Sequence, residues 1–104
     1  MNSYIALSQE VIPSRIFCNP KRLSVFVYLL LNANEKAQKI GKEKIKRGSL
    51  TTTNETISDF CGITIQNART VLAYLETIGE IKRERRNRYQ IITIVNYEKY
   101  KDDI

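Results

Sequence analysis

Hydrophobic residues recur at helical spacing in three stretches of the chain. The first stretch follows Asn19 and Pro20, which supply a cap and a proline for the first helical position. Its apolar residues would cover more than half of the helix circumference: Leu23, Phe26, Val27, Leu30 and Leu31. The pattern therefore predicts a largely buried helix over residues 21–34, at the centre of the core.

Two further helices are predicted close together in the middle of the chain. Thr53 or Asn54 is the expected N-cap of the first, and Gly62 should end it in the left-handed conformation. Thr64 is the expected N-cap of the second, and Gly79 should end that helix. The residues predicted to face the core are Ile57, Phe60 and Cys61 on the first helix, and Ile65, Ala68, Val71, Leu72, Leu75 and Ile78 on the second.

The other segments are predicted from β-like runs and turn residues. Residues 80–84 and 89–96 indicate a hairpin, and Asn87 in its turn suits a positive φ. We expect a short strand within residues 45–51, an exposed loop over residues 35–44, and either a strand or a helical turn over residues 4–12. Tyr97 and Tyr100 should pack on the core, and residues 101–103 should fray.

The overall composition favours one compact domain over residues 1–104. Of the 104 residues, 42% are hydrophobic and 27% are charged, which are ordinary values for a globular protein. The predicted elements give an α+β fold that is mainly helical. The pattern of a signal peptide is missing, and the longest apolar run is too short to cross a bilayer. We therefore expect a cytoplasmic protein that does not contact a membrane.

The residue types leave little for catalysis or metal binding. The chain has no histidine, and Cys18 and Cys61 are not spaced as metal ligands. A phosphate-binding glycine loop, an acidic cluster and a base partner for a serine are also lacking. We predict that the protein is not an enzyme and has no catalytic residues, no metal, no cofactor and no small-molecule substrate. The two cysteines are expected to be small buried hydrophobic residues.

The positive charge of the chain is concentrated in two short stretches. The net charge is +6, and the isoelectric point is near 9.5. One stretch holds Lys39, Lys42, Lys44, Lys46 and Arg47 against Glu43, and the other holds Lys82, Arg83, Arg85, Arg86 and Arg88 against Glu84. The second is rich in arginine, whose planar guanidinium matches phosphate oxygens and guanine edges. Such clusters favour a polyanionic partner.

The order of the predicted elements is that of a winged helix-turn-helix, a three-helix core with a C-terminal β-hairpin wing. Two capped helices joined by a glycine-containing turn are followed directly by a basic hairpin. The second of these helices would then be a recognition helix that enters the major groove of double-stranded DNA. Element order, caps and charge agree, so we predict binding to double-stranded DNA.

Three groups of residues are predicted to contact the DNA. On the recognition helix, the outward-facing residues are Thr64, Gln66, Asn67, Arg69, Thr70 and Tyr74. Their side chains can bond base edges and phosphates. In the wing, Arg83, Arg85, Arg86 and Arg88 would follow a phosphate strand or enter the minor groove, and the three at the tip are the stronger candidates. Lys44, Lys46 and Arg47 are candidates for flanking backbone contacts.

Four segments give the chain a family resemblance. They are LSVFVYLLLNAN, IKRGSLTT, GITIQNARTVLAYLETIGEI and ITIVNYEKY, which are distributed over residues 23–100. With them the chain resembles the N-terminal winged-helix domains of phage and plasmid replication initiators and replisome organisers, and the start of DnaD-type primosome proteins. The resemblance implies DNA binding, in replication initiation. Relatives often carry a tryptophan where this chain has Tyr4 and Tyr97, and they usually continue into a second, helical domain.

Other functions remain open from the sequence. A stand-alone transcriptional regulator would carry the same elements. A protein-protein interaction module, including a homo-oligomer, would use the apolar N-terminal segment that contains Tyr4, Ile5, Leu7, Val11, Ile12, Ile16 and Phe17. Its arginines would then maintain solubility or bind an acidic partner. Single-strand or RNA binding is less favoured, because the tyrosines are not grouped in sequence as a stacking platform.

Overall fold

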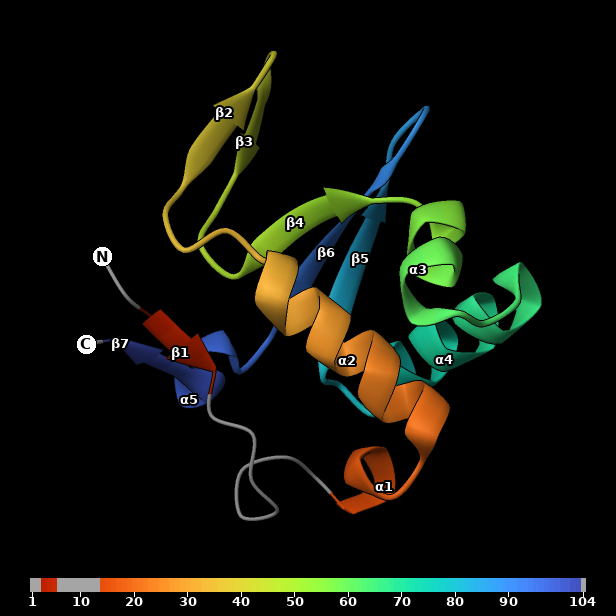
Figure 1. The fold of residues 1–104 in the computed structure, drawn as a ribbon. Helices are drawn as coiled ribbons and strands as arrows, with labels where there is room; N and C mark the ends of the chain where they lie inside the picture. The colour runs from red at the N-terminus through yellow and green to blue at the C-terminus, as the bar shows by residue number, and fades with distance from the viewer. Residues whose placement is uncertain (1–2, 6–13, 104) are drawn as a thin grey trace.

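The computed structural model describes residues 3–5 and 14–103, which form a mixed α+β fold. Helices pack on one side of a small antiparallel sheet, and two further strand pairs lie outside it (Figure 1). The elements in chain order are β1 (Ser3–Ile5), α1 (Ser14–Phe17), α2 (Pro20–Asn32), β2 (Gln38–Ile40), β3 (Glu43–Ile45), β4 (Ser49–Thr52), α3 (Asn54–Cys61), α4 (Ile65–Thr77), β5 (Ile81–Arg85), β6 (Gln90–Ile94), α5 (Tyr97–Tyr100) and β7 (Lys101–Asp103).

Helix α2 is the centre of the core, as predicted. The Asn19 side chain accepts a hydrogen bond of 3.1 Å from the backbone N–H of Arg22, and Pro20 is the first helical residue. Val25, Phe26 and Leu29 are fully buried, and α2 contacts both α3 and α4. The helix ends at Asn32, within two residues of the predicted end.

Helices α3 and α4 have the predicted caps. Thr53 accepts a hydrogen bond from Thr56 N, and Thr64 accepts one from Asn67 N. Gly62 ends α3 at φ 66°, in the left-handed region that suits glycine. A turn of three residues, 62–64, separates the two helices.

Three residues on predicted apolar faces are exposed instead. Leu31 of α2 is 65% exposed, Phe60 of α3 is 73% exposed, and Ile65 of α4 is 39% exposed. Ser58 takes an inward position on α3, where its hydroxyl donates a hydrogen bond of 2.6 Å to the Ile63 carbonyl across the turn. The Phe60 ring lies on the outside of the helix pair, against Tyr28.

The main sheet has the strand order β4-β6-β5 and is antiparallel throughout. The hairpin β5–β6 and the short strand β4 confirm the predictions for these segments. β6 is the central strand, and its Ile91, Ile92 and Ile94 are buried, as the apolar run indicated. The prediction of a positive φ at Asn87 is wrong: among the described residues, only glycines have one.

Residues 35–44 were predicted to be an exposed loop, but they contain most of a second hairpin. β2 pairs with β3 in antiparallel register, Ile40 opposite Glu43, and Gly41 at φ 60° allows the two-residue turn between them. Ile45, at the end of β3, is fully buried and anchors the hairpin. The lysine-rich composition did not predict these strands, because lysine is generally depleted in strands.

The described ends of the chain form a strand pair. Residues 101–103, predicted to fray, pair as β7 with β1, Ser3 opposite Asp103. As predicted, Tyr97 and Tyr100 are buried, and the Tyr100 ring meets Phe26 edge-on at 5.2 Å. The predicted strand or helical turn over residues 4–12 is a strand at Tyr4 and Ile5, and residues 6–13 lie outside the described part of the chain.

The two cysteines are more exposed than predicted. Cys18 is exposed, Cys61 is half-buried, and both are free thiols. Cys18 stands in the short connection between α1 and the cap of α2, where it does not reach the core that its neighbour Ile16 enters. Among the described helices, none has the length and apolar character needed to cross a membrane.

Candidate nucleic-acid interface

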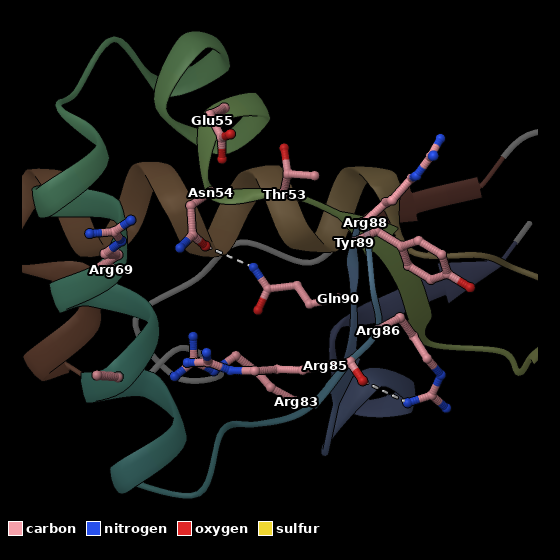
Figure 2. Close-up of a pocket in the computed structure, with 11 residues that line it drawn as sticks. Thr53, Asn54, Glu55, Arg69, Arg83, Arg85, Arg86, Arg88, Tyr89 and Gln90 are labelled. Carbon is pink, nitrogen blue, oxygen red and sulfur yellow. Dashed lines mark hydrogen bonds between the residues drawn. The ribbon is translucent and has the colours of Figure 1, made fainter.

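An open groove of about 580 Å³ lies between helix α4 and the β5–β6 hairpin (Figure 2). The N-terminus of α3 forms one end of it. Its lining contains five arginines and a single acidic residue, Glu55. The lining residues are Thr53, Asn54, Glu55, Arg69, Ala73, Arg83, Arg85, Arg86, Arg88, Tyr89 and Gln90.

Helix α4 presents its polar face on this side of the molecule. Arg69 and Ala73, one turn apart, line the groove, and both are exposed. Gln66 and Thr70 are exposed on the adjacent strip of the helix, where the Thr70 hydroxyl donates a hydrogen bond of 3.0 Å to the Gln66 carbonyl. Three of the predicted recognition residues, Gln66, Arg69 and Thr70, are thus open to a partner.

The other three predicted recognition residues have different surroundings. Thr64 is exposed, but its hydroxyl caps α4. Asn67 and Tyr74, two turns apart on the opposite shoulder of the helix, are half-buried. The prediction that Tyr74 is exposed is wrong: its ring packs against the core, and the Arg22 guanidinium lies 3.7 Å from the ring centre.

Alternation along β5 separates its cations between the two faces of the hairpin. Arg83 and Arg85 point toward α4, whereas Lys82 and Glu84 lie on the opposite face. Arg83 forms an ion pair of 2.9 Å with Glu76 of α4, and only 16% of its side chain is exposed. Arg83 therefore fastens the hairpin to the helix.

Arg86 also has a structural partner, on β3. Its guanidinium makes a two-point ion pair with Glu43, at 2.6 and 3.2 Å, and points away from α4 (Figure 2). The hydrogen bonds from Arg86 hold the pKa of the Glu43 carboxyl below its ordinary value, and the same bonds raise the pKa of Arg86. This contact joins the β5–β6 hairpin to the β2–β3 hairpin.

The remaining arginines of the groove have unengaged guanidinium groups. Within the part of the chain that the structure describes, no hydrogen bond or ion pair holds the side chains of Arg69, Arg85 or Arg88. All three residues are exposed. Figure 2 shows Arg85 reaching across the groove toward α4, where Arg69 lies. Three free cations thus come together from two elements.

The predicted flanking cations lie outside the groove lining. Arg47 bonds Glu98 with two nitrogens, at 2.5 and 2.9 Å, and also donates to the Glu35 carbonyl. These bonds lower the pKa of Glu98. Lys44 and Lys46 are exposed, and Lys44 stands directly opposite Lys39 in the β2–β3 hairpin.

Asn54, which the sequence indicated only as an alternative cap, and Gln90, which it did not indicate, shape the end of the groove. The Gln90 amide donates a hydrogen bond of 2.7 Å to Asn54 Oδ1, which ties β6 to the first residue of α3 (Figure 2). This bond sets the free N–H groups of α3 beside the arginines. The cap at Thr53 marked the start of α3, but the pairing with Gln90 depends on strand register.

Among the described residues, no group of three or more His, Cys, Asp or Glu side chains is placed to hold a metal ion. Comparisons with protein-family models, curated proteins and solved structures found no match to this chain.

Proposed function

We propose that this chain is a winged helix-turn-helix domain that binds double-stranded DNA. In this arrangement α3 and α4 are the helix-turn-helix, α4 is the recognition helix, and β5–β6 is the wing. The left-handed Gly62 and the caps at Thr53 and Thr64 support the motif, because they fix a tight turn between two short helices.

The observation that carries the proposal is the convergence of Arg69, Arg85 and Arg88 on one groove. Each guanidinium is free of an acidic partner among the described residues, and the groove has only Glu55 to offset the positive charge. A cluster of uncompensated cations repels itself unless an anion is bound. The N-terminus of α3 adds N–H donors that suit a phosphate at the same place.

We expect the predicted contacts to have different roles. Gln66, Arg69 and Thr70 lie on the open face of α4, where their side chains could bond base edges in the major groove. Arg85 and Arg88 supply the wing contacts to phosphates. Arg83 and Arg86 position the wing through Glu76 and Glu43, so we expect them to act indirectly.

We further propose a role in replication initiation. The four sequence segments that resemble replication initiators and replisome organisers include all of α4 and β4 and part of β6. A transcriptional regulator would use the same groove, and a search for the preferred site in origin or promoter DNA distinguishes the two.

The test is fluorescence anisotropy on random-sequence duplex DNA across a salt series. We expect the logarithm of the binding constant to fall with the logarithm of salt at a slope of roughly −3 to −6. The double variant R85A/R88A should reduce the slope by about 2, since each phosphate contact contributes about 0.9.

A matched control removes the same charge elsewhere. Lys82 lies on the other face of β5, and Lys99 is exposed on α5, so K82A/K99A should leave the slope nearly unchanged. Equal losses in the two double variants would show that only net charge matters and would overturn the assigned groove. Absence of duplex binding by the wild-type protein at low salt would overturn the proposed function.

A further inference from the structure

A second hollow of about 290 Å³ adjoins the arginine groove. Its lining is mostly apolar and comes from α2, the β2–β3 hairpin, β4, α3 and the start of β6. It shares Thr53 and Tyr89 with the groove, so the two hollows are neighbours. The lining residues are Tyr28, Ile40, Thr51, Thr52, Thr53, Thr56 and Tyr89.

Two aromatic residues, Tyr28 and Tyr89, line this hollow, and a third, Phe60, packs against Tyr28. The Tyr28 ring is held in place, because its hydroxyl forms a hydrogen bond of 3.0 Å with Thr52. Phe60 lies 5.2 Å from Tyr28 between ring centres, and it follows the hollow-lining Thr56 by one turn of α3. Tyr89 stands at the opening to the groove, with its ring turned away from α4 (Figure 2). Tyr28, Phe60 and Tyr89 are called the aromatic cluster below.

The exposure of Phe60 is not explained by the folded chain alone. Its side chain packs on Tyr28 yet leaves 73% of the residue in solvent. Tyr89 is half-buried, and Ile40 adds an exposed apolar side chain to the same hollow. An apolar surface beside free arginines combines the two features that single-stranded nucleic acids need, a stacking partner for bases and a cation for phosphates.

We propose that the aromatic cluster binds unpaired bases of DNA whose duplex part is held in the arginine groove. The inference rests on the proposed function and makes the preferred ligand a junction between duplex and single strand. A strand leaving the groove would pass Thr53 and Tyr89 directly into the hollow, with its phosphates near Arg88. Bases within a duplex already stack on each other, so only unpaired bases can use these rings.

The test compares a blunt duplex with the same duplex carrying a thymidine tail at either its 3′ or its 5′ end. Wild-type protein should bind one tailed duplex at least about fivefold more tightly than the blunt one, the lower end of the contribution of one stacked base. F60A should lose most of this gain and keep its affinity for the blunt duplex. Y89A changes a residue that also lines the arginine groove, so its loss of the gain is measured against its own affinity for the blunt duplex. Y89F should retain the gain, because it keeps the ring.

Two controls separate stacking from a structural defect or another partner. L31A removes an apolar side chain that is 65% exposed on α2 and does not line the hollow, so it should retain the gain. A 2-aminopurine base placed in the tail should lose fluorescence on binding to the wild-type protein and Y89F, but not to Y89A. If F60A instead turned a wild-type dimer into a monomer in sedimentation, the cluster would be a self-association surface and the inference would be wrong.

The outcomes also distinguish this inference from the proposed function. If the blunt duplex binds but the tail adds nothing and 2-aminopurine does not respond, only the inference fails. If the blunt duplex does not bind at all, the proposed function fails. Binding of a thymidine strand with the same dependence on Tyr89, without duplex binding, would retain the aromatic cluster as a base-binding site and reject the duplex groove.

Discussion

Gly48 offers a sharp test of the packing between the C-terminal helix and the main sheet. It lies in the turn before β4 at φ 82°, and a Cβ added there would stand 2.9 Å from the Cβ of Tyr97. Its N–H donates to the Asn34 carbonyl, and its own carbonyl accepts from Ile94 N. The backbone is therefore fixed from both sides, and an added methyl group has little freedom to move away.

The expected loss of stability in G48A follows from comparison with Gly62. Gly62 also has a positive φ, 66°, but an added Cβ there would have nothing within 4 Å. In G62A the free energy of unfolding should fall only by the cost of placing alanine in the left-handed region, about 1–2 kcal/mol. G48A should carry that cost and a further overpacking cost of about 1–3 kcal/mol. The reduced entropy of the unfolded chain favours both variants about equally, so it cancels in the comparison.

The assay is urea and thermal unfolding followed by circular dichroism. G48A should be less stable than G62A by about 1–3 kcal/mol. For a domain of this size, that difference corresponds to a midpoint lower by roughly 4 °C or more. Equal stabilities would refute the close approach of Tyr97 to the turn. G48A should cost less stability in a Y97A background than in the wild type, since Y97A removes the ring atoms at 3.0 and 3.3 Å from the added Cβ. Part of the cost should remain, because alanine keeps the Cβ at 2.9 Å.

Four further expectations follow from the contacts described above. R69A should weaken discrimination at one base position of a selected site by about 1–3 kcal/mol; an equal loss on every sequence would make Arg69 a phosphate contact. A double-mutant cycle on Arg83 and Glu76 should give a coupling of about 1 kcal/mol in unfolding free energy, at the upper end for such pairs because Arg83 is largely covered. In an NMR titration the Glu43 carboxyl should have a pKa below 4.5, and R86Q should return the pKa to that ordinary value. The Glu43–Arg86 pair should stabilise the folded protein fully above the ordinary pKa, and this stabilisation should be lost as pH falls through the lowered pKa. Burial, and after it the hydrogen bond to Glu80, raises the pKa of Tyr100 above 10.0. The neutral Tyr100 should therefore stabilise the folded protein fully below pH 10.0, and this stabilisation should be lost as pH rises toward the raised pKa. Phenolate absorbance should show one tyrosine that ionises late in the folded protein.

The sequence predicted those features that depend on local chemistry. Asn19, Thr53 and Thr64 are caps whose side chains bond their own first turns, and Gly62 is required by its own φ. The apolar run in β6 is long enough to indicate a buried strand without knowledge of its neighbours. The three long helices, β4 and the β5–β6 hairpin could therefore be obtained from local patterns, whereas the β2–β3 hairpin and β7 could not.

The partners of the basic residues could not be predicted in this way. The four arginines within residues 83–88 look equivalent in sequence. In the structure Arg83 pairs with Glu76 and Arg86 pairs with Glu43. Arg85 and Arg88 have no acidic partner among the described residues. Glu43 precedes Arg86 by 43 residues, and only the pairing of β2 with β3 brings it near the wing. Helical periodicity likewise places Phe60 and Ile65 near the core face, but it does not show whether another element covers their side chains.

The pairing of β1 with β7 gives the molecule a particular response to mechanical load. The strands are antiparallel, so Ser3 and Asp103 lie at the same end of the pair (Figure 1). Tension between these two residues would act on the backbone hydrogen bonds one after another, as a zipper opens, and not on all of them together. The pair should therefore yield at low force, while α4 and the β5–β6 hairpin, which lie elsewhere in the fold, keep their shape. A tether attached through the two ends would give way there first and leave the arginine groove intact.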